Sequence, residues 1–238
     1  MESILLIINY IMETIDNFEL IKCLLEFASE DDFYFVQILQ RKKEHPELGS
    51  NSRVIKTYYI RNLDHFEGVK DEIMKLCIMF NARAYLHPTK RSFEKTTYQT
   101  LKMITDYIIQ PDFPHAHRCW DSACGKYSSG KKRWIIDIDD DTASAGCEEI
   151  TDFINSVEPL DDKNKVLLKV PTKNGYHLIT KPFNLMTFNK KFPKIDVHKN
   201  NPTLLFAVKY CKEESASELL EKIAQEISDI LFVKNQKI

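Results

Sequence analysis

The sequence predicts an α+β protein in which mixed sheets are flanked by helices. Segments with strand-like apolar patterns are interspersed with segments of helical periodicity along the chain. Two of the predicted strands are joined by the tight turn Thr172-Lys173-Asn174-Gly175, and an Asn-Gly pair before a strand is typical of a hairpin. Hairpins among alternating helices and strands favour a mixed sheet over a doubly wound parallel one.

The elements are predicted in order from periodicity and from turn residues. Helices are expected at residues 17–28, 64–80, 93–109, 148–157, 187–192 and 217–231. Strands are expected at residues 33–40, 54–60, 83–86, 133–138, 166–170, 176–180 and 204–208. Residues 110–132 hold Pro, Gly, Ser and Lys without a clear period, which predicts a long functional or mobile loop.

The composition is that of a globular protein with a sizeable core. Of the 238 residues, 43% are hydrophobic and 29% are charged, which excludes disorder as the main state. The scarcity of Gly, with 6, and the presence of only 9 Pro exclude fibrous and low-complexity classes. A net charge of -2 excludes a generally basic nucleic-acid coat, although a local basic cleft remains compatible with it.

The cysteines and the N-terminus predict a cytoplasmic protein. None of the six cysteines forms a CxxC pair, so we expect reduced thiols. The apolar run from Ile4 to Ile8 has no basic segment before it, no small-residue cleavage site after it, and is too short to span a bilayer. We therefore expect neither a signal peptide nor a membrane anchor. The first eleven residues are expected to be an extension that is weakly attached to the fold.

The sharpest local feature is the apolar strand Trp134-Ile135-Ile136-Asp137-Ile138-Asp139, which ends in carboxylates. Residues two apart on a strand share a face, so Asp137 and Asp139 would lie side by side. Two such charges repel each other unless a cation lies between them, and hard oxygen ligands suit Mg²⁺ or Mn²⁺. The alternative is an acidic strand end that caps the next helix.

A second feature is His177, which follows the hairpin turn on an otherwise apolar strand. Taken alone, such a histidine is more often a satisfied core residue. The turn before it, however, offers Thr172, Lys173 and backbone N–H groups near Gly175, and such turns bind phosphate oxygens.

A third feature is Asp196, which is the one acidic residue among nine lysines between Lys163 and Lys199. This carboxylate is predicted to be a third metal ligand within a phosphate-binding wall. We expect a positive groove beside it, formed by Lys173, Lys181, Lys190 and Lys199. The alternative is a solvated lysine face with one ion pair.

These three features in this order resemble the archaeo-eukaryotic primase superfamily, which includes primase-polymerases. That family has an apolar strand ending in D-x-D, then a strand with a small residue two before a His, then an apolar residue followed by Asp. Trp134–Asp139, Gly175-x-His177 and Ile195-Asp196 correspond to the three motifs. The resemblance spans roughly residues 130–208. It implies that Asp137, Asp139 and Asp196 bind metal and are catalytic, and that His177 contacts the triphosphate of the nucleotide.

The resemblance also implies a fold and a function for the whole chain. Residues 1–238 would form a single primase-like catalytic core, with an N-terminal α/β half over 1–110, the loop over 111–131 and an RRM-like half over 132–238. The protein would be a metal-dependent nucleotidyltransferase that makes or extends short nucleic-acid strands from nucleoside triphosphates on a single-stranded template. It would act in DNA replication, in a bacteriophage or mobile-element setting, with a separate helicase as a further partner. Beside His177, the nucleotide would contact Thr172, Lys173 and Lys199.

Two further groups of residues are candidate binding sites. His115, His117, Cys119 and Cys124 are four potential zinc ligands within ten residues, although their spacing matches no standard zinc module. Basic residues interleaved with aromatic ones predict contacts with single-stranded nucleic acid, since such residues pair phosphates and stack on bases. The residues assigned to this role are Lys131, Lys132, Arg133 and Arg91.

Three other functions compete with nucleotidyl transfer. A phosphatase of the haloacid-dehalogenase type shares an apolar strand followed by D-x-D, but Thr142 lies one position too late for that motif. A metal-dependent nuclease would use the same carboxylates. A module that binds nucleic acid without catalysis would show salt-dependent binding and no nucleotide addition.

Overall fold

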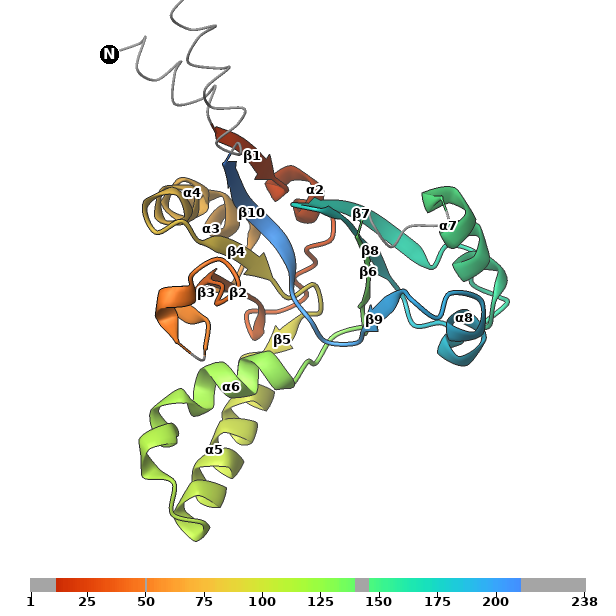
Figure 1. Ribbon diagram of the computed structural model, residues 1–238. Coiled ribbons are helices and arrows are strands. Elements are labelled where there is room, and N and C mark those ends of the chain that lie inside the picture. The colour runs from red at the N-terminus through yellow and green to blue at the C-terminus, as the bar shows by residue number, and fades with distance from the viewer. Residues whose placement is uncertain (1–11, 50, 140–145, 211–238) are drawn as a thin grey trace, which may run out of the picture. The chain divides into compact units, whose positions relative to one another are not determined.

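The computed structural model describes residues 12–49, 51–139 and 146–210 (Figure 1). The chain forms two compact units, one of residues 16–207 and a smaller one of residues 1–15 with 208–238. Strand β1 (Met12–Asp16) pairs with strand β10 (Thr203–Tyr210), and each of the two strands has residues in both units. The predicted helix over 217–231 and the extension over 1–11 lie outside the described residues.

In the larger unit, the described residues form two antiparallel sheets, which confirms the α+β class. The first sheet has the order β10-β4-β2-β3, with β5 pairing with β2. Its remaining strands are β2 (Asp32–Gln40), β3 (Arg53–Ile60), β4 (Arg83–Leu86) and β5 (Arg91–Ser92). It is accompanied by helices α2 (Phe18–Lys22), α3 (Leu63–Gly68), α4 (Lys70–Met79), α5 (Phe93–Ile109) and α6 (Cys119–Lys126), and by 3-10 helices η1 (Pro46–Leu48) and η2 (Phe113–Arg118).

The second sheet is formed in a continuous β-α-β-β-α-β run with the order β7-β8-β6-β9. Its elements are β6 (Trp134–Asp139), α7 (Cys147–Ser156), β7 (Val166–Thr172), β8 (Gly175–Thr180), α8 (Leu185–Lys191) and β9 (Asp196–His198). One face of this sheet is covered by α7 and α8, because the alternate residues Ile136, Ile138 and Leu178 pack against apolar side chains of both helices. The polar residues of the same strands are therefore left on the opposite face.

The β7–β8 hairpin depends on Gly175. Its φ of +151° lies in a region that favours glycine, and a Cβ at this position would come within 2.1 Å of the carbonyl oxygen of Ile138. The absence of a side chain therefore lets β8 begin directly beside the end of β6, where Asp139 is the register partner of Gly175.

Three predicted elements differ from the structure for identifiable reasons. The helix expected over 17–28 ends at Lys22. After it, the amides of Leu24 and Leu25 donate to carbonyls only three residues back, and those of Ala28 and Ser29 donate to the Asp32 carboxylate. The single helix expected over 64–80 is divided at Gly68 into α3 and α4.

The loop expected over 110–132 contains η2 and α6, and this corrects the prediction of an irregular segment. Cys119, Ala123 and Cys124 of this segment are buried, and Cys124 packs against Phe33 and Phe35 of β2. Helix α6 has only 8 residues, which is too short a segment for a helical period to be recognised in the sequence.

The predicted boundary at residue 132 does not separate the two sheets. Strand β10 follows the second sheet in sequence, yet it pairs with β4 of the first, with Leu204 opposite Tyr85. Residues from both ends of the unit also meet through Asn17, whose buried side-chain amide donates to the carbonyl oxygens of Pro171 and Leu204 at 3.0 Å each.

Candidate functional site

The free face of the second sheet presents a row of polar residues. Asp137 on β6 is the register partner of His177 on β8 and of Asp196 on β9. Because register partners and residues two apart on a strand share a face, Asp137, Asp139, His177 and Asp196 all belong to this face. Asp137 and Asp139 share this face because they are two residues apart on β6, and the register adds His177 and Asp196 to it.

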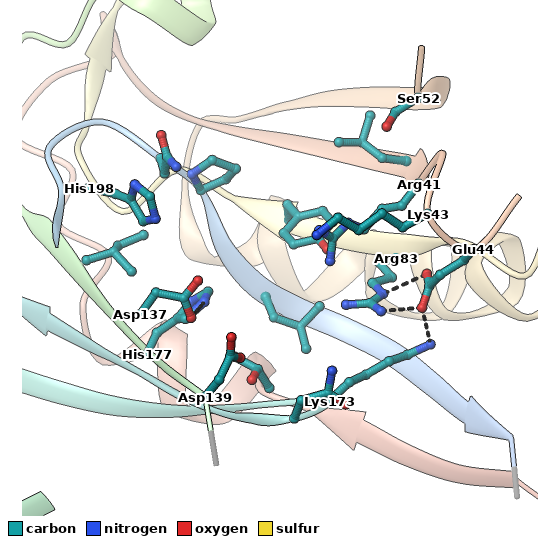
Figure 2. Close-up of a pocket in the computed structure, with 18 residues that line it drawn as sticks. Arg41, Lys43, Glu44, Ser52, Arg83, Asp137, Asp139, Lys173, His177 and His198 are labelled. Carbon is teal, nitrogen blue, oxygen red and sulfur yellow. Dashed lines mark hydrogen bonds and ion pairs between the residues drawn. The ribbon is translucent and has the colours of Figure 1, made fainter. Parts of the chain in front are cut away.

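A cavity of about 540 Å³ opens onto this face. One wall comes from the second sheet and its β7–β8 turn, and the other comes from β4 and the loop after β2 in the first sheet (Figure 2). Its charged and imidazole-bearing lining residues are Arg41, Lys43, Glu44, Arg83, Asp137, Asp139, Lys173, His177 and His198.

Asp137 and His177 contact each other in the wall of the cavity that the second sheet forms. The imidazole Nε2 lies 3.3 Å from the carboxylate Oδ1, and Nδ1 lies 2.9 Å from the Thr203 hydroxyl. The hydrogen bond from His177, aided by the charges of His198 and Arg41, holds the pKa of Asp137 below its usual range although partial burial opposes this. Asp137 is therefore ionised at neutral pH and attracts cations.

The opposite end of the cavity holds an ion triad that joins the two sheets. The Glu44 carboxylate accepts from Arg83 Nε at 2.9 Å and from Arg83 Nη2, and it accepts from Lys173 Nζ at 3.1 Å. Figure 2 shows Arg41 and Lys43 extending into the cavity between this triad and the Asp137–His177 pair. The cationic side chains therefore gather with Glu44 at one end of the cavity, and the Asp137–His177 pair lies at the other.

The donor chemistry on the free face fits a hard divalent cation. Asp137, Asp139 and Asp196 offer carboxylate oxygens, which Mg²⁺ and Mn²⁺ prefer, and the first and last of these are register partners. In the described side chains as they stand, however, no three His, Cys, Asp or Glu residues are gathered closely enough to hold a metal ion. Asp196 lies exposed on the edge strand β9, so closure of the three carboxylates would require it to turn toward Asp137.

The residues predicted to bind nucleotide divide into two groups. Thr172, Lys173 and His177 line the cavity, whereas the Lys199 ammonium lies 5.2 Å from the centre of the Trp134 ring. The predicted groove of four lysines is not formed as such: Lys181 pairs with Asp162 at 2.8 Å, and Lys190 is on α8, which packs on the other face of the sheet. Of the four, Lys173 is the one among the lining residues.

Both arginines assigned to nucleic acid bond to backbone carbonyls, and for Arg91, which is buried, this corrects the prediction. Arg91 is 0% exposed, and its guanidinium donates to the carbonyl oxygens of Thr89 and Cys124 and to Asn200 Oδ1. Arg133 donates to the carbonyl oxygens of Leu24 and Pro88.

Lys131 and Lys132 differ from these two arginines, because both are exposed. Lys131 and the half-buried Arg133 both line a second cavity of about 300 Å³. The two lysines therefore remain accessible to a phosphate backbone, and for them the predicted contact with nucleic acid stays a prediction.

The predicted zinc site is not formed by the four residues proposed for it. His115 and His117 are exposed and bond locally, to Asp112 Oδ1 at 2.6 Å and to the carbonyl oxygen of Pro114 at 2.8 Å. Cys119 and Cys124 are buried instead, and burial raises the pKa of the Cys124 thiol to about 12. A thiol in that environment stays protonated and is a poor zinc ligand.

Sequence reasoning missed the contribution of the first sheet to the cavity. Arg41, Lys43 and Glu44 follow the strand predicted at residues 33–40, and neither they nor His198 had an assigned role. The available signal was the run Arg41-Lys42-Lys43 at the end of a buried strand, which is an unusual concentration of charge for a turn.

Comparison with known proteins finds no family model, no curated protein and no solved structure that matches this chain. Among the described residues, none of the helices has the length and apolar character needed to cross a membrane.

Proposed function

We propose that this protein is a metal-dependent nucleotidyltransferase of the primase-polymerase type, which uses nucleoside triphosphates to make or extend nucleic-acid strands. The observation that supports this most is that Asp137, Asp139 and His177 line a cavity whose other wall is cationic, while Asp196 on β9 is the register partner of Asp137. Nucleotidyl transfer needs carboxylates for cations and positive groups for the outgoing phosphates, and the two kinds of group occupy neighbouring parts of this cavity.

The topology gives independent support. The order β7-β8-β6-β9 in a β-α-β-β-α-β run is that of the ferredoxin-like fold, to which an RRM-like half would correspond. In this arrangement the two central strands are β8 and β6, which present His177 and the two strand aspartates. We propose that this half, together with the first sheet, is a primase-like core.

Each part of the cavity receives a role in this proposal. Asp137, Asp139 and Asp196 would hold one or two divalent cations, which when bound would neutralise phosphate charge during transfer. His177 would contact the triphosphate, and its ring is held in place by the hydrogen bond between Nδ1 and the Thr203 hydroxyl. Arg41 and Lys43 would hold the phosphates from the opposite wall and Lys173 from the β7–β8 turn. The exposed Lys131 and Lys132 would contact the template strand.

The decisive experiment measures nucleotide addition to a primed or unprimed single-stranded template with Mg²⁺ or Mn²⁺. Replacing Asp137 and Asp139 together by Ala should abolish addition, because the cation site would lose two of its three carboxylates. A matched control is Asp152→Ala, which removes an exposed carboxylate on α7 of the same half. The proposal fails if the double variant adds nucleotides as well as wild type.

The same experiment separates the competing functions. Salt-dependent binding of single strands by wild type, without addition under either cation, would indicate a binding module. Degradation of the template that depends on Asp137 would indicate a nuclease, and release of phosphate from small phosphoesters would indicate a phosphatase.

A further inference from the structure

The Glu44 carboxylate is held as a bound anion would be held. It receives two hydrogen bonds from the Arg83 guanidinium and one from the Lys173 ammonium. Bidentate contact with a guanidinium is the geometry in which proteins recognise carboxylate and phosphate alike. Two oxygens of a phosphate group could therefore take the places of the two carboxylate oxygens of Glu44.

The charges around this position are not balanced. Arg83 and Lys173 together supply two positive charges against the one negative charge of Glu44. Burial and the positive charge of Arg83 lower the pKa of Lys173 in spite of its contact with Glu44, and Arg41 acts in the same direction. A ligand with more negative charge than one carboxylate would relieve this repulsion better than Glu44 does.

The three side chains are also sheltered from water. Their exposed fractions are 11% for Arg83, 15% for Lys173 and 26% for Glu44. Glu44 is at the end of a short turn after β2, in which the next residue is anchored by a bond of 2.7 Å from the His45 ring to the carbonyl oxygen of Asn81. Glu44 can thus change its side-chain torsions while its backbone stays attached to the first sheet.

We propose that Arg83 and Lys173 form the binding site for the terminal phosphates of the substrate, and that Glu44 is a resident anion that a polyphosphate must displace. The inference deepens the proposed function, on which it rests for the natural substrate. A compact polyphosphate end is favoured over the backbone of a nucleic-acid strand because the triad is sheltered inside the cavity. Arg83 is thereby assigned a binding role, and Glu44 tunes the affinity.

The test is a titration of inorganic tripolyphosphate into the intact protein, followed by calorimetry at low salt. Glu44→Gln keeps the shape of the side chain but removes its charge, so the dissociation constant should fall by about ten-fold. Glu47→Gln is the matched control, because Glu47 is in the same loop and pairs only with His45 among the described residues. Adding Arg83→Gln to Glu44→Gln should cancel the gain. Unchanged or weaker binding by Glu44→Gln would overturn the proposal, because Glu44 would then only position Lys173.

A second measurement distinguishes a free polyphosphate from a nucleic-acid backbone as the source of the phosphate. A third measurement uses the wild-type protein alone. A single-stranded oligonucleotide should bind to Glu44→Gln and to wild type with equal affinity. If Glu44→Gln instead binds the oligonucleotide more tightly than wild type does, and tripolyphosphate no more tightly, the site takes a backbone phosphate and the proposal is rejected. In wild type, tripolyphosphate should move the carboxyl ¹³C resonance of Glu44 to that of a solvent-exposed glutamate, and binding without this shift would also reject it. None of these measurements requires nucleotide addition, so their outcome is independent of whether the proposed enzyme activity exists.

Discussion

His177 and Asp137 face each other across β8 and β6, and the histidine is held on its other side by Thr203 of the first sheet. An ionised carboxylate can only accept, so Nε2 donates to Asp137, and Nδ1 shares a hydrogen bond with the Thr203 hydroxyl. One imidazole therefore joins the two sheets and has a defined orientation in the cavity.

Replacing Thr203 by Val should loosen this imidazole. Thr203 is fully buried, so loss of the hydroxyl should lower the free energy of unfolding by about 1 kcal/mol and should weaken binding of a nucleoside triphosphate several-fold. Urea denaturation and equilibrium binding measure the two effects. Thr180→Val is the control, because the buried Thr180 hydroxyl on β8 has no hydrogen-bond partner among the described residues. That variant should be neutral or stabilising, and equal losses for both variants would contradict the role of Thr203.

Replacing Arg41 and Lys43 together by Gln should weaken the binding of nucleoside triphosphate by about ten-fold or more, because two cations would leave the wall opposite Asp137. The dissociation constant should also become less sensitive to salt. Lys42→Gln serves as control, since Lys42 is between them but is not among the lining residues. If Lys42→Gln has the same effect, the attraction is a general property of the loop and not of the cavity.

Replacing Arg91 by Lys should destabilise the protein, because a lysine cannot reproduce the contacts of the guanidinium with Thr89, Cys124 and Asn200. The expected loss is about 3 kcal/mol in the free energy of unfolding, measured by urea denaturation. The paired exchange of Lys131 and Lys132 for Gln should instead leave stability unchanged and weaken binding of a single-stranded oligonucleotide. A stable Arg91→Lys protein that binds oligonucleotide poorly would restore the original assignment of Arg91 to nucleic acid.

Replacing Asp32 by Asn should reduce stability at neutral pH by about 2 kcal/mol, since Asp32 accepts from Lys90 and from the amides of Ala28 and Ser29. Burial opposes ionisation of this carboxyl, but the contacts with Lys90 and the two amides hold its pKa below the ordinary 3.8.

A lowered pKa in the folded state means that the contribution of Asp32 is complete above about pH 4 and is lost as the pH falls below that value. The difference between wild type and Asp32→Asn should therefore shrink in acid. Denaturation curves at several pH values check this, and a constant difference would contradict it.

The sequence predicted most strands of this fold and the carboxylates of the site. The pattern of β6 identified Asp137 and Asp139, because residues two apart on a strand share a face whatever the rest of the fold does. Asp196 lies beside Asp137 because β9 pairs with β6. The order of the three motifs suggests this pairing, but the periodicity of the sequence does not show it.

The opposite wall of the cavity was not predictable in the same way. In the ion triad, Glu44 is 39 positions from Arg83 and 129 positions from Lys173 along the chain. Arg91 was misassigned because a basic residue among aromatic ones has the same sequence pattern on a surface and in a core. Only its neighbours show that its charge is buried.

Strand β10 has a consequence for how the protein is made. It pairs with β4 in the first sheet, although it is synthesised after the whole of the second sheet. During translation the edge of β4 must therefore wait unpaired until residues beyond Ala207 have left the ribosome, and an unpaired edge is prone to aggregation. Expressing residues 1–132 alone should give an insoluble or chaperone-bound product, whereas any successful dissection of this protein must keep β10 together with β4.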